Sequence, residues 1–203
     1  MKEFYPDSKQ ALEKNFYLQP TDRAAGELLG KVLVRKTDHG FLAGKIVETE
    51  AYIPDGDPAN HSTVAQTKRN AAMREEGGIL YIYKIYGVHH CVNIVTEQKG
   101  RGCAVLLRAL EPLAGMDQMA QNRGTGKLRD LCRGPGNLAK AFGLTTEQNF
   151  ESVTSENIFV QNFEYPKKND IISDVRIGIS KAADLELRYY YKNCKYVSGK
   201  KKG

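Results

Sequence analysis

Long apolar runs are absent from this sequence. Nowhere in the 203 residues do eighteen apolar residues follow one another, and the N-terminus MKEFYPDSKQ has no apolar core of the signal-peptide kind. These absences argue against a membrane-spanning helix and against secretion. We therefore expect an intracellular protein that makes no contact with a membrane.

Clustered cysteines are also missing. The sequence has four, widely spaced and without a Cys-x-x-Cys pair: Cys91, Cys103, Cys132 and Cys194. This spacing favours neither a zinc knuckle nor a dense disulfide framework, so we expect reduced thiols. Walker and Gly-x-Gly-x-x-Gly loops, the Gly-x-Ser-x-Gly elbow and the signature of zinc deaminases are absent as well.

The histidines do not form a metal-binding pattern. His89 and His90 are adjacent, so a strand would point them to opposite faces. His61 has no helical ligand spacing to Asp55 or Asp57. We therefore predict no metal site and no cofactor.

What the sequence does have is positive charge, with 30 Lys and Arg against 24 Asp and Glu and a net charge of +6. The excess is uneven, because residues 45–62 hold four carboxylates and one lysine, a net −3. The rest of the chain carries +9, the difference between +6 and −3. An acidic segment in a basic body suits a catalytic pocket on a phosphate-binding surface, although basic segments are often only solvated.

The order of predicted elements indicates one α+β domain, residues 1–203, with a mainly antiparallel sheet. The patterns predict a helix at 21–30 capped by Thr21 and Asp22, strands at 31–37 and 41–52, an irregular connection at 54–78, a hairpin at 79–96 turning near Tyr86 and Gly87, a strand at 102–112, helices at 113–121 and 137–144, and strand character at 174–182 and 185–199. We expect residues 1–15 to be peripheral and the basic tail 198–203 to be disordered.

Two glutamates in the acidic segment are candidates for chemistry. In an extended strand Glu48, Glu50 and Tyr52 share one face, and apolar neighbours cover both faces. A partly desolvated carboxylate there has a raised pKa and is a competent general base. A structural salt bridge to a lysine or arginine is equally compatible with the pattern.

The hairpin holds a second group of candidates. Tyr81 and Tyr83 share a face, which is more typical of packing than of a ligand platform. Tyr86 lies at the tip, where a large aromatic buries little in its own core and is a candidate wedge for a base stack. Asn93 lies among apolar residues, where its amide needs partners and backbone groups alone would satisfy it.

Longer motifs run along the chain in a fixed order. They are VETEAY, Ala59-Asn60-His61-Ser62, Thr67-Lys68-Arg69-Asn70, GILYIYKIYG, VNI, LLRALEP, LCRGPGNLAKAF, VRIGIS and LRYY. Together they resemble the alkyladenine (3-methyladenine) DNA glycosylase family of mammals and many bacteria. The resemblance covers the chain from about Phe16 and is more specific than any single motif.

The resemblance concerns ten positions, eight with implied roles and two that depart from the family's usual residues. Glu50 resembles the general base that activates water, and Arg108 its partner, with the backbone carbonyl of Ile177. Tyr52 and Tyr83 resemble the aromatics that sandwich a flipped base, and His61 the group at its edge. Asn93 resembles the filter against the 2-amino group of guanine, and Tyr86 resembles the minor-groove wedge. Two positions depart from the family: Val88 stands where a methionine is usual, and Gly77 where a proline is usual.

The implied function is base excision repair of DNA by a monofunctional glycosylase with no lyase activity. Its substrates would be alkylated or deaminated purines in duplex DNA: 3-methyladenine, 7-methylguanine, hypoxanthine and ethenoadenine. The resemblance also implies a curved sheet with a protruding β-hairpin and surrounding helices, a monomer, and a place in the cytoplasm or nucleoid of a bacterium or the nucleus of a eukaryote. The alternatives are a metal-dependent nuclease using the four carboxylates, or a non-catalytic nucleic-acid-binding module.

Overall fold

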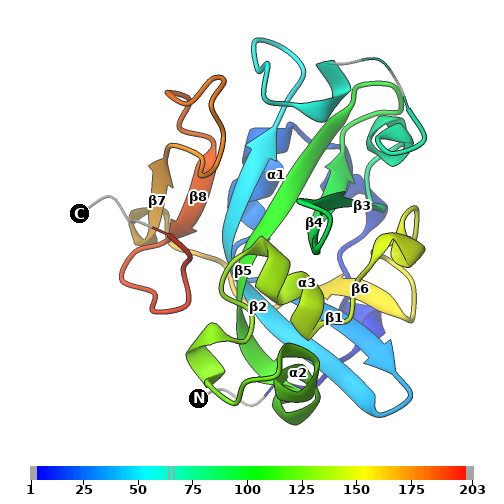
Figure 1. Ribbon diagram of the computed structural model, residues 1–203, viewed down its shortest axis with the longest axis vertical. Coiled ribbons are helices and arrows are strands. Elements are labelled where there is room, and N and C mark those ends of the chain that lie inside the picture. The colour runs from blue at the N-terminus through cyan, green and yellow to red at the C-terminus, as the bar shows by residue number, and fades with distance from the viewer. Residues whose placement is uncertain (1–3, 64, 66, 200–203) are drawn as a thin grey trace.

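The computed structural model describes residues 4–63, 65 and 67–199, and in these residues the chain forms a single α+β domain around one curved antiparallel sheet (Figure 1). The strands are β1 Val32–Thr37, β2 Gly40–Tyr52, β3 Leu80–Ile85, β4 His89–Thr96, β5 Cys103–Ala114, β6 Ile158–Gln161, β7 Ile171–Asp174 and β8 Arg188–Tyr191. Their order is β3-β4-β5-β2-β1-β6, with β8 between β2 and β7. The long strand β2 therefore pairs with β1 in its first half and with β8 in its second.

Three helices pack against this sheet: α1 Thr21–Leu28, α2 Met116–Arg123 and α3 Pro135–Ala141. Helix α1 contacts β2 and β5, α3 contacts β4 and β5, and α2 contacts α3. Single 3₁₀ turns lie at Ser8–Gln10, Lys14–Leu18, His61–Thr63, Ala71–Arg74, Leu128–Asp130, Thr146–Gln148 and Lys168–Asp170. None of the helices in the described ranges has the length and apolar character needed to cross a membrane.

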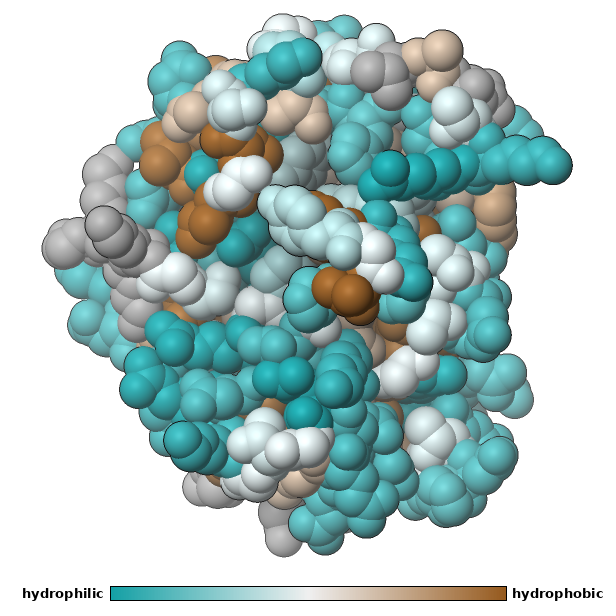
Figure 2. All heavy atoms as spheres, viewed as in Figure 1, coloured by the Kyte–Doolittle hydropathy of each residue, from teal (hydrophilic) through white to brown (hydrophobic). Residues whose placement is uncertain are grey.

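The main core lies between the helices and the sheet. It joins apolar side chains of α1, such as Leu28, to those of β2, β5 and α3, such as Ile46, Leu107 and Leu138. On the face that Figure 2 shows, hydrophilic residues dominate, and apolar side chains appear in separate islands. The burial of these apolar surfaces is the main stabilising contribution to the fold.

Three register shifts interrupt the pairing of β2 with β5, and the two that flank Glu48 are β-bulges that aim side chains toward the interior. Ile46 pairs with Leu110 and Glu48 with Ala109, which leaves Val47 as an extra residue on β2. Thr49 then pairs with Leu107, so Arg108 is the extra residue on β5. Bulges are frequent next to active sites because they redirect side chains. Here they bring Arg108 to the same side of the sheet as Glu48 and Glu50.

Most of the predicted elements are confirmed, including the β1–β2 hairpin, the β3–β4 hairpin and both later helices. Several predictions are wrong. Thr21 is the first residue of α1 and does not cap it, because its hydroxyl contacts Thr96 and Glu97 instead. Strand β5 continues past Pro112 to Ala114. Residues 175–182 are irregular, the strand predicted at 185–199 is confirmed only at 188–191, and β6 and β7 were not predicted.

The two ends of the described chain both contact the fold. Leu12 donates its N–H to Val160 of β6, at the edge of the sheet. The predicted disordered tail does not begin at 198, because Ser198 is 6% exposed and its N–H donates to Glu48 at 2.6 Å. Residues 1–3 and 200–203, which complete the two predicted terminal segments, lie outside the described residues.

Candidate active site

A cavity of about 470 Å³ opens beside the β3–β4 hairpin, lined also by β2, β5, the N-terminus of α3 and residues 177–179. Tyrosines from β2 and the hairpin dominate its wall: Tyr52, Tyr81, Tyr83 and Tyr86. Among the described residues that line it, Arg108 is the only lysine, arginine, aspartate or glutamate. A largely apolar, aromatic cavity with few polar groups is the usual form of a small-molecule site.

Glu50 lies behind the cavity wall and is completely buried. The N–H of Ile177 donates to its Oε1 at 2.8 Å, and Nη1 of Arg108 lies 3.2 Å from the same oxygen. The Tyr52 hydroxyl donates to Oε2 at 2.9 Å. Burial raises the pKa of Glu50, while Arg108, the Ile177 N–H and the Tyr52 hydroxyl oppose the rise. The result is a carboxyl that is poised to accept a proton.

Arg108 bridges both glutamates of the acidic segment. Its Nε lies 3.2 Å from Oε1 of Glu48, which also accepts from Nε of Arg188 at 2.7 Å. The salt-bridge alternative is therefore confirmed for Glu48, and it also describes part of the surroundings of Glu50. Arg188, the first residue of β8, is 1% exposed and belongs to this buried network.

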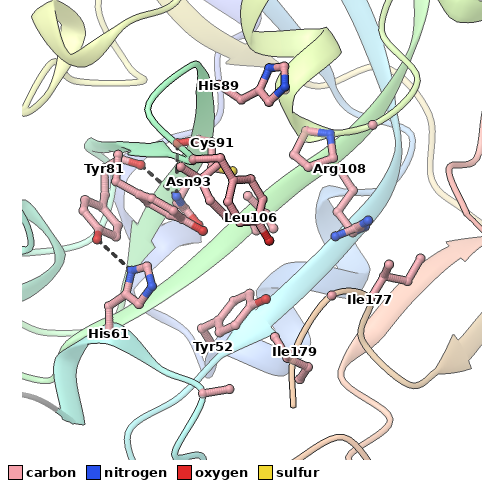
Figure 3. A pocket seen from close by; sticks show the side chains of 18 of the residues that line it. Tyr52, His61, Tyr81, His89, Cys91, Asn93, Leu106, Arg108, Ile177 and Ile179 are labelled. Carbon is pink, nitrogen blue, oxygen red and sulfur yellow. Dashed lines mark hydrogen bonds between the residues drawn. The ribbon is translucent and has the colours of Figure 1, made fainter. Parts of the chain in front are cut away.

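His61 lies across the cavity from Arg108, and Figure 3 shows Tyr52 pointing into the space between them. Nδ1 of His61 is 2.9 Å from the Tyr81 hydroxyl, and the His61 ring meets the Tyr83 ring edge-on with centroids 4.6 Å apart. Burial and nearby Arg69 lower the pKa of His61. A neutral imidazole keeps one nitrogen as donor and the other as acceptor, so Nε2 stays available to a ligand.

Asn93 forms part of the cavity wall on β4, opposite Tyr81 of β3. Its amide donates to the Tyr81 carbonyl at 2.9 Å, as Figure 3 shows, so the prediction that it bonds to backbone is confirmed. The same bond fixes the orientation of the amide at the cavity surface. Asn93 is therefore both satisfied and placed to contact a bound molecule.

Tyr86 lies at the tip of the hairpin and is 84% exposed. Its φ is +52°, and Gly87 follows with φ of +70°, in a turn closed by the Val88 N–H and the Ile85 carbonyl at 3.3 Å. A positive φ is unfavourable for a bulky residue, so an exposed tyrosine in this conformation indicates function more than packing.

The other acidic residues each pair with a different arginine. Asp55 contacts Arg101 at 2.7 Å on the surface, and Asp57 contacts Arg176 at 2.6 Å in the interior. Both aspartates therefore form ion pairs of the fold. Within the described ranges no group of three or more histidine, cysteine or acidic side chains is placed to hold a metal ion.

Sequence reasoning missed two residues at this site. Tyr81 was assigned to packing, but its hydroxyl contacts His61; its register with Tyr83 on β3 was the available signal. Arg176 was not singled out, although its guanidinium contacts both Asp57 and the ring of Tyr52. No local pattern marks it, because its partners lie more than a hundred residues earlier in the chain, 119 in the case of Asp57.

Comparison with known proteins gives consistent matches. The model of the family described as "Methylpurine-DNA glycosylase (MPG)" matches residues 15–195. A protein of Chlorobium phaeobacteroides is 43% identical over 96% of this chain and 98% of its own, and one of Methanoculleus marisnigri is 45% identical over 90% and 96%. A protein of Francisella tularensis is 44% identical over 87% and 93%. All three carry the name "Putative 3-methyladenine DNA glycosylase".

Proposed function

Because the chain belongs to the methylpurine-DNA glycosylase family, we propose that it is a monofunctional DNA glycosylase whose general base is Glu50. The observation that carries this proposal is a buried carboxylate with a raised pKa, held by Arg108 and the Ile177 N–H beside a tyrosine-lined cavity. The product is an abasic site, the first intermediate of base excision repair.

The reaction replaces the N-glycosidic bond by a bond to water. The electron pair of the C1′–N bond leaves with the base, and the sugar takes on oxocarbenium character. The oxygen of water bonds to C1′ while its proton passes to Glu50. The carboxylate thus stabilises the developing positive charge and accepts the proton in one step.

The hydrogen bonds of Glu50 leave room for such a water. A carboxylate has about four lone-pair positions. Among the described residues the Ile177 N–H and Arg108 occupy Oε1, and the Tyr52 hydroxyl takes one position on Oε2. We assign the remaining position on Oε2 to the attacking water, with the carbonyl of Ile177 as its second acceptor. Arg108 orients the carboxylate.

The cavity suits a purine turned out of the DNA stack. All four proposed contact residues line the cavity: Tyr52 and Tyr83 would offer ring faces, His61 a nitrogen at the edge, and Asn93 would meet a 2-amino group. Stacking on aromatic side chains contributes about 1–3 kcal/mol per base and does not depend on sequence. Tyr86 is proposed as the wedge that fills the vacated space, since unstacking and kinking DNA requires an exposed apolar side chain.

We propose as substrates 3-methyladenine, 7-methylguanine, hypoxanthine and ethenoadenine in duplex DNA, bound by a monomer that acts where the cell keeps its DNA. The test uses duplexes with a single hypoxanthine or 3-methyladenine, followed by alkali. The unsubstituted chain is expected to produce abasic sites, and Glu50→Gln to be slower by roughly 10²–10⁴-fold. Full-rate cleavage by Glu50→Gln, or no abasic site with either lesion, would contradict the proposal.

The same assay separates the alternatives. A metal-dependent nuclease would lose activity in EDTA, and it would need carboxylates that converge, whereas here each acid is paired with an arginine. A non-catalytic binding module would release no base. Strand scission without alkali would instead indicate a lyase with an amine nucleophile.

A further inference from the structure

A buried arginine lies against Tyr52 on the side away from the cavity. The guanidinium of Arg176 lies over the Tyr52 ring, 4.6 Å from its centroid. Arg176 is 4% exposed, whereas Tyr52 lines the cavity. One face of the ring therefore meets a cation, and the other face meets the space where a base would stack.

Asp57 pairs with this arginine through two parallel contacts. Nη1 donates to Oδ2 and Nη2 donates to Oδ1, both at 2.6 Å, and Nη1 also donates to the Ala51 carbonyl at 3.0 Å. Both side chains are fully buried. Because the two charges are in direct contact, the carboxylate cancels most of the field of the guanidinium beyond Tyr52.

The other arginine at the cavity is balanced in the same way. Arg108 contacts both Glu48 and Glu50 at 3.2 Å. Removal of Asp57 would leave Arg176 as an unpaired cation immediately behind the stacking surface. The arrangement therefore does more than fix the backbone, because it also sets the electrostatic potential of the cavity.

We propose that the Asp57–Arg176 pair determines which charge of base the cavity accepts, and that Asp57 keeps the cavity open to cationic purines. This inference rests on the proposed function, but it concerns the binding of the base and not the cleavage of the bond. Asp57 and Arg176 are positioning and specificity residues and touch no reacting atom.

The expected size of the effect follows from distance. A base stacked on Tyr52 would lie about 8 Å from the guanidinium, the sum of 4.6 Å and a stacking separation of about 3.5 Å. An unpaired charge at that distance, at an effective dielectric constant of about 20, weakens the binding of a cationic base by roughly thirtyfold. A neutral base is nearly unaffected.

The experiment measures the equilibrium binding of duplexes in a Glu50→Gln background, where the base stays attached. Three duplexes are compared: one with cationic 7-methylguanine, one with neutral hypoxanthine, and one with a tetrahydrofuran abasic analogue as the reference for folding and DNA contact. Relative to that reference, Asp57→Asn is expected to weaken the 7-methylguanine duplex roughly thirtyfold more than the hypoxanthine duplex.

A second variant separates charge from structure. Asp57→Asn combined with Arg176→Met removes both charges. In this double variant the binding of the 7-methylguanine duplex relative to the hypoxanthine duplex is expected to return to that of the Glu50→Gln background. Equal weakening of both duplexes by Asp57→Asn, or a difference that persists in the double variant, would overturn the proposal. The proposed function is tested separately by base release from the unsubstituted chain, so failure of one is distinguishable from failure of the other.

Discussion

The two halves of the candidate site, the glutamate–arginine network and the hairpin tip, differ in how far the protein buries and bonds their side chains. Glu50, Glu48 and Arg108 are buried and bonded to one another and to backbone N–H groups. The hairpin tip is the opposite, since Tyr86 and Val88 are 84% and 68% exposed. The glutamate–arginine half is held in place by its own hydrogen bonds, whereas the tip has an unfavourable backbone conformation and a large apolar surface in water.

This contrast fits the two tasks that we propose. Stabilising a developing charge requires groups that are already oriented, because reorganisation during the reaction would raise the barrier. Entering a base stack requires an apolar side chain that has little to lose from the protein surface. Substitutions in the buried half should therefore lower stability and rate together, and loss of the tyrosine side chain at the tip should lower the rate without lowering stability.

Replacing Arg108 is expected to have the largest effect of this kind. Arg108→Met leaves the buried Glu48 and Glu50 without their shared cation. We expect the free energy of unfolding to fall by about 3–5 kcal/mol, as measured by urea denaturation. Base excision should fall with it, because the pKa of Glu50 rises further when the arginine is removed.

Arg101→Met is the matched control. Arg101 pairs with Asp55 and Glu97 at the surface, where its side chain is 47% exposed. Exposed ion pairs contribute about 0–1 kcal/mol. Equal losses of stability in the two variants would show that burial does not distinguish the networks.

Tyr86→Ser tests the other side of the comparison. Single-turnover excision is expected to fall roughly fivefold to a hundredfold, the equivalent of about 1–3 kcal/mol of stacking, with an unchanged unfolding midpoint. Phe150→Ser is the control, because Phe150 is also aromatic, 49% exposed and at positive φ, but it lies outside the cavity. An unchanged rate of excision by Tyr86→Ser would contradict the proposal that Tyr86 is the wedge.

The same contrast explains what the sequence predicts. The hairpin tip is predictable, because alternating β-branched and aromatic residues flank a Tyr-Gly turn. The carboxylate on β2 is also identifiable, since an acid in an apolar strand requires a partner or a use. These are local patterns, and they account for most strands and for the α+β class.

The arginines that complete the site are not predictable in this way. Arg108 reaches the glutamates through a bulge, and a bulge depends on the register between β2 and β5. Residues 175–182 alternate like a strand, but Arg176 and Ile177 bond to Asp57 and Glu50 instead of to a neighbouring strand. Long-range partners of this kind override local propensity.

Tyr52→Phe should produce a smaller effect, visible mainly in the pH profile. The ring and its contact with Arg176 remain, but the hydroxyl that donates to Glu50 is lost. That hydrogen bond lowers the pKa of Glu50, so its removal raises the pKa. Because the base must be ionised to accept a proton, the acid side of the excision profile should move to higher pH. Tyr83→Phe is the control, because the Tyr83 hydroxyl bonds to Cys91 whereas that of Tyr52 donates to Glu50, and it should leave the acid side of the profile unchanged. Identical profiles for the two variants would contradict the assignment.

The smallest expected effect is a gain in stability at the tip. Tyr86→Gly removes the side chain from a position with φ of +52°, where glycine has no steric penalty. Glycine has a greater conformational entropy in the unfolded chain, which offsets part of the steric penalty that is removed. We therefore expect the free energy of unfolding to rise by roughly 0.5–1 kcal/mol. Phe150→Gly, at φ of +69°, should give a similar gain without loss of excision. A loss of stability in Tyr86→Gly would mean that the tyrosine packs favourably on its own protein, and that the tip is not held in an unfavourable conformation for the sake of DNA.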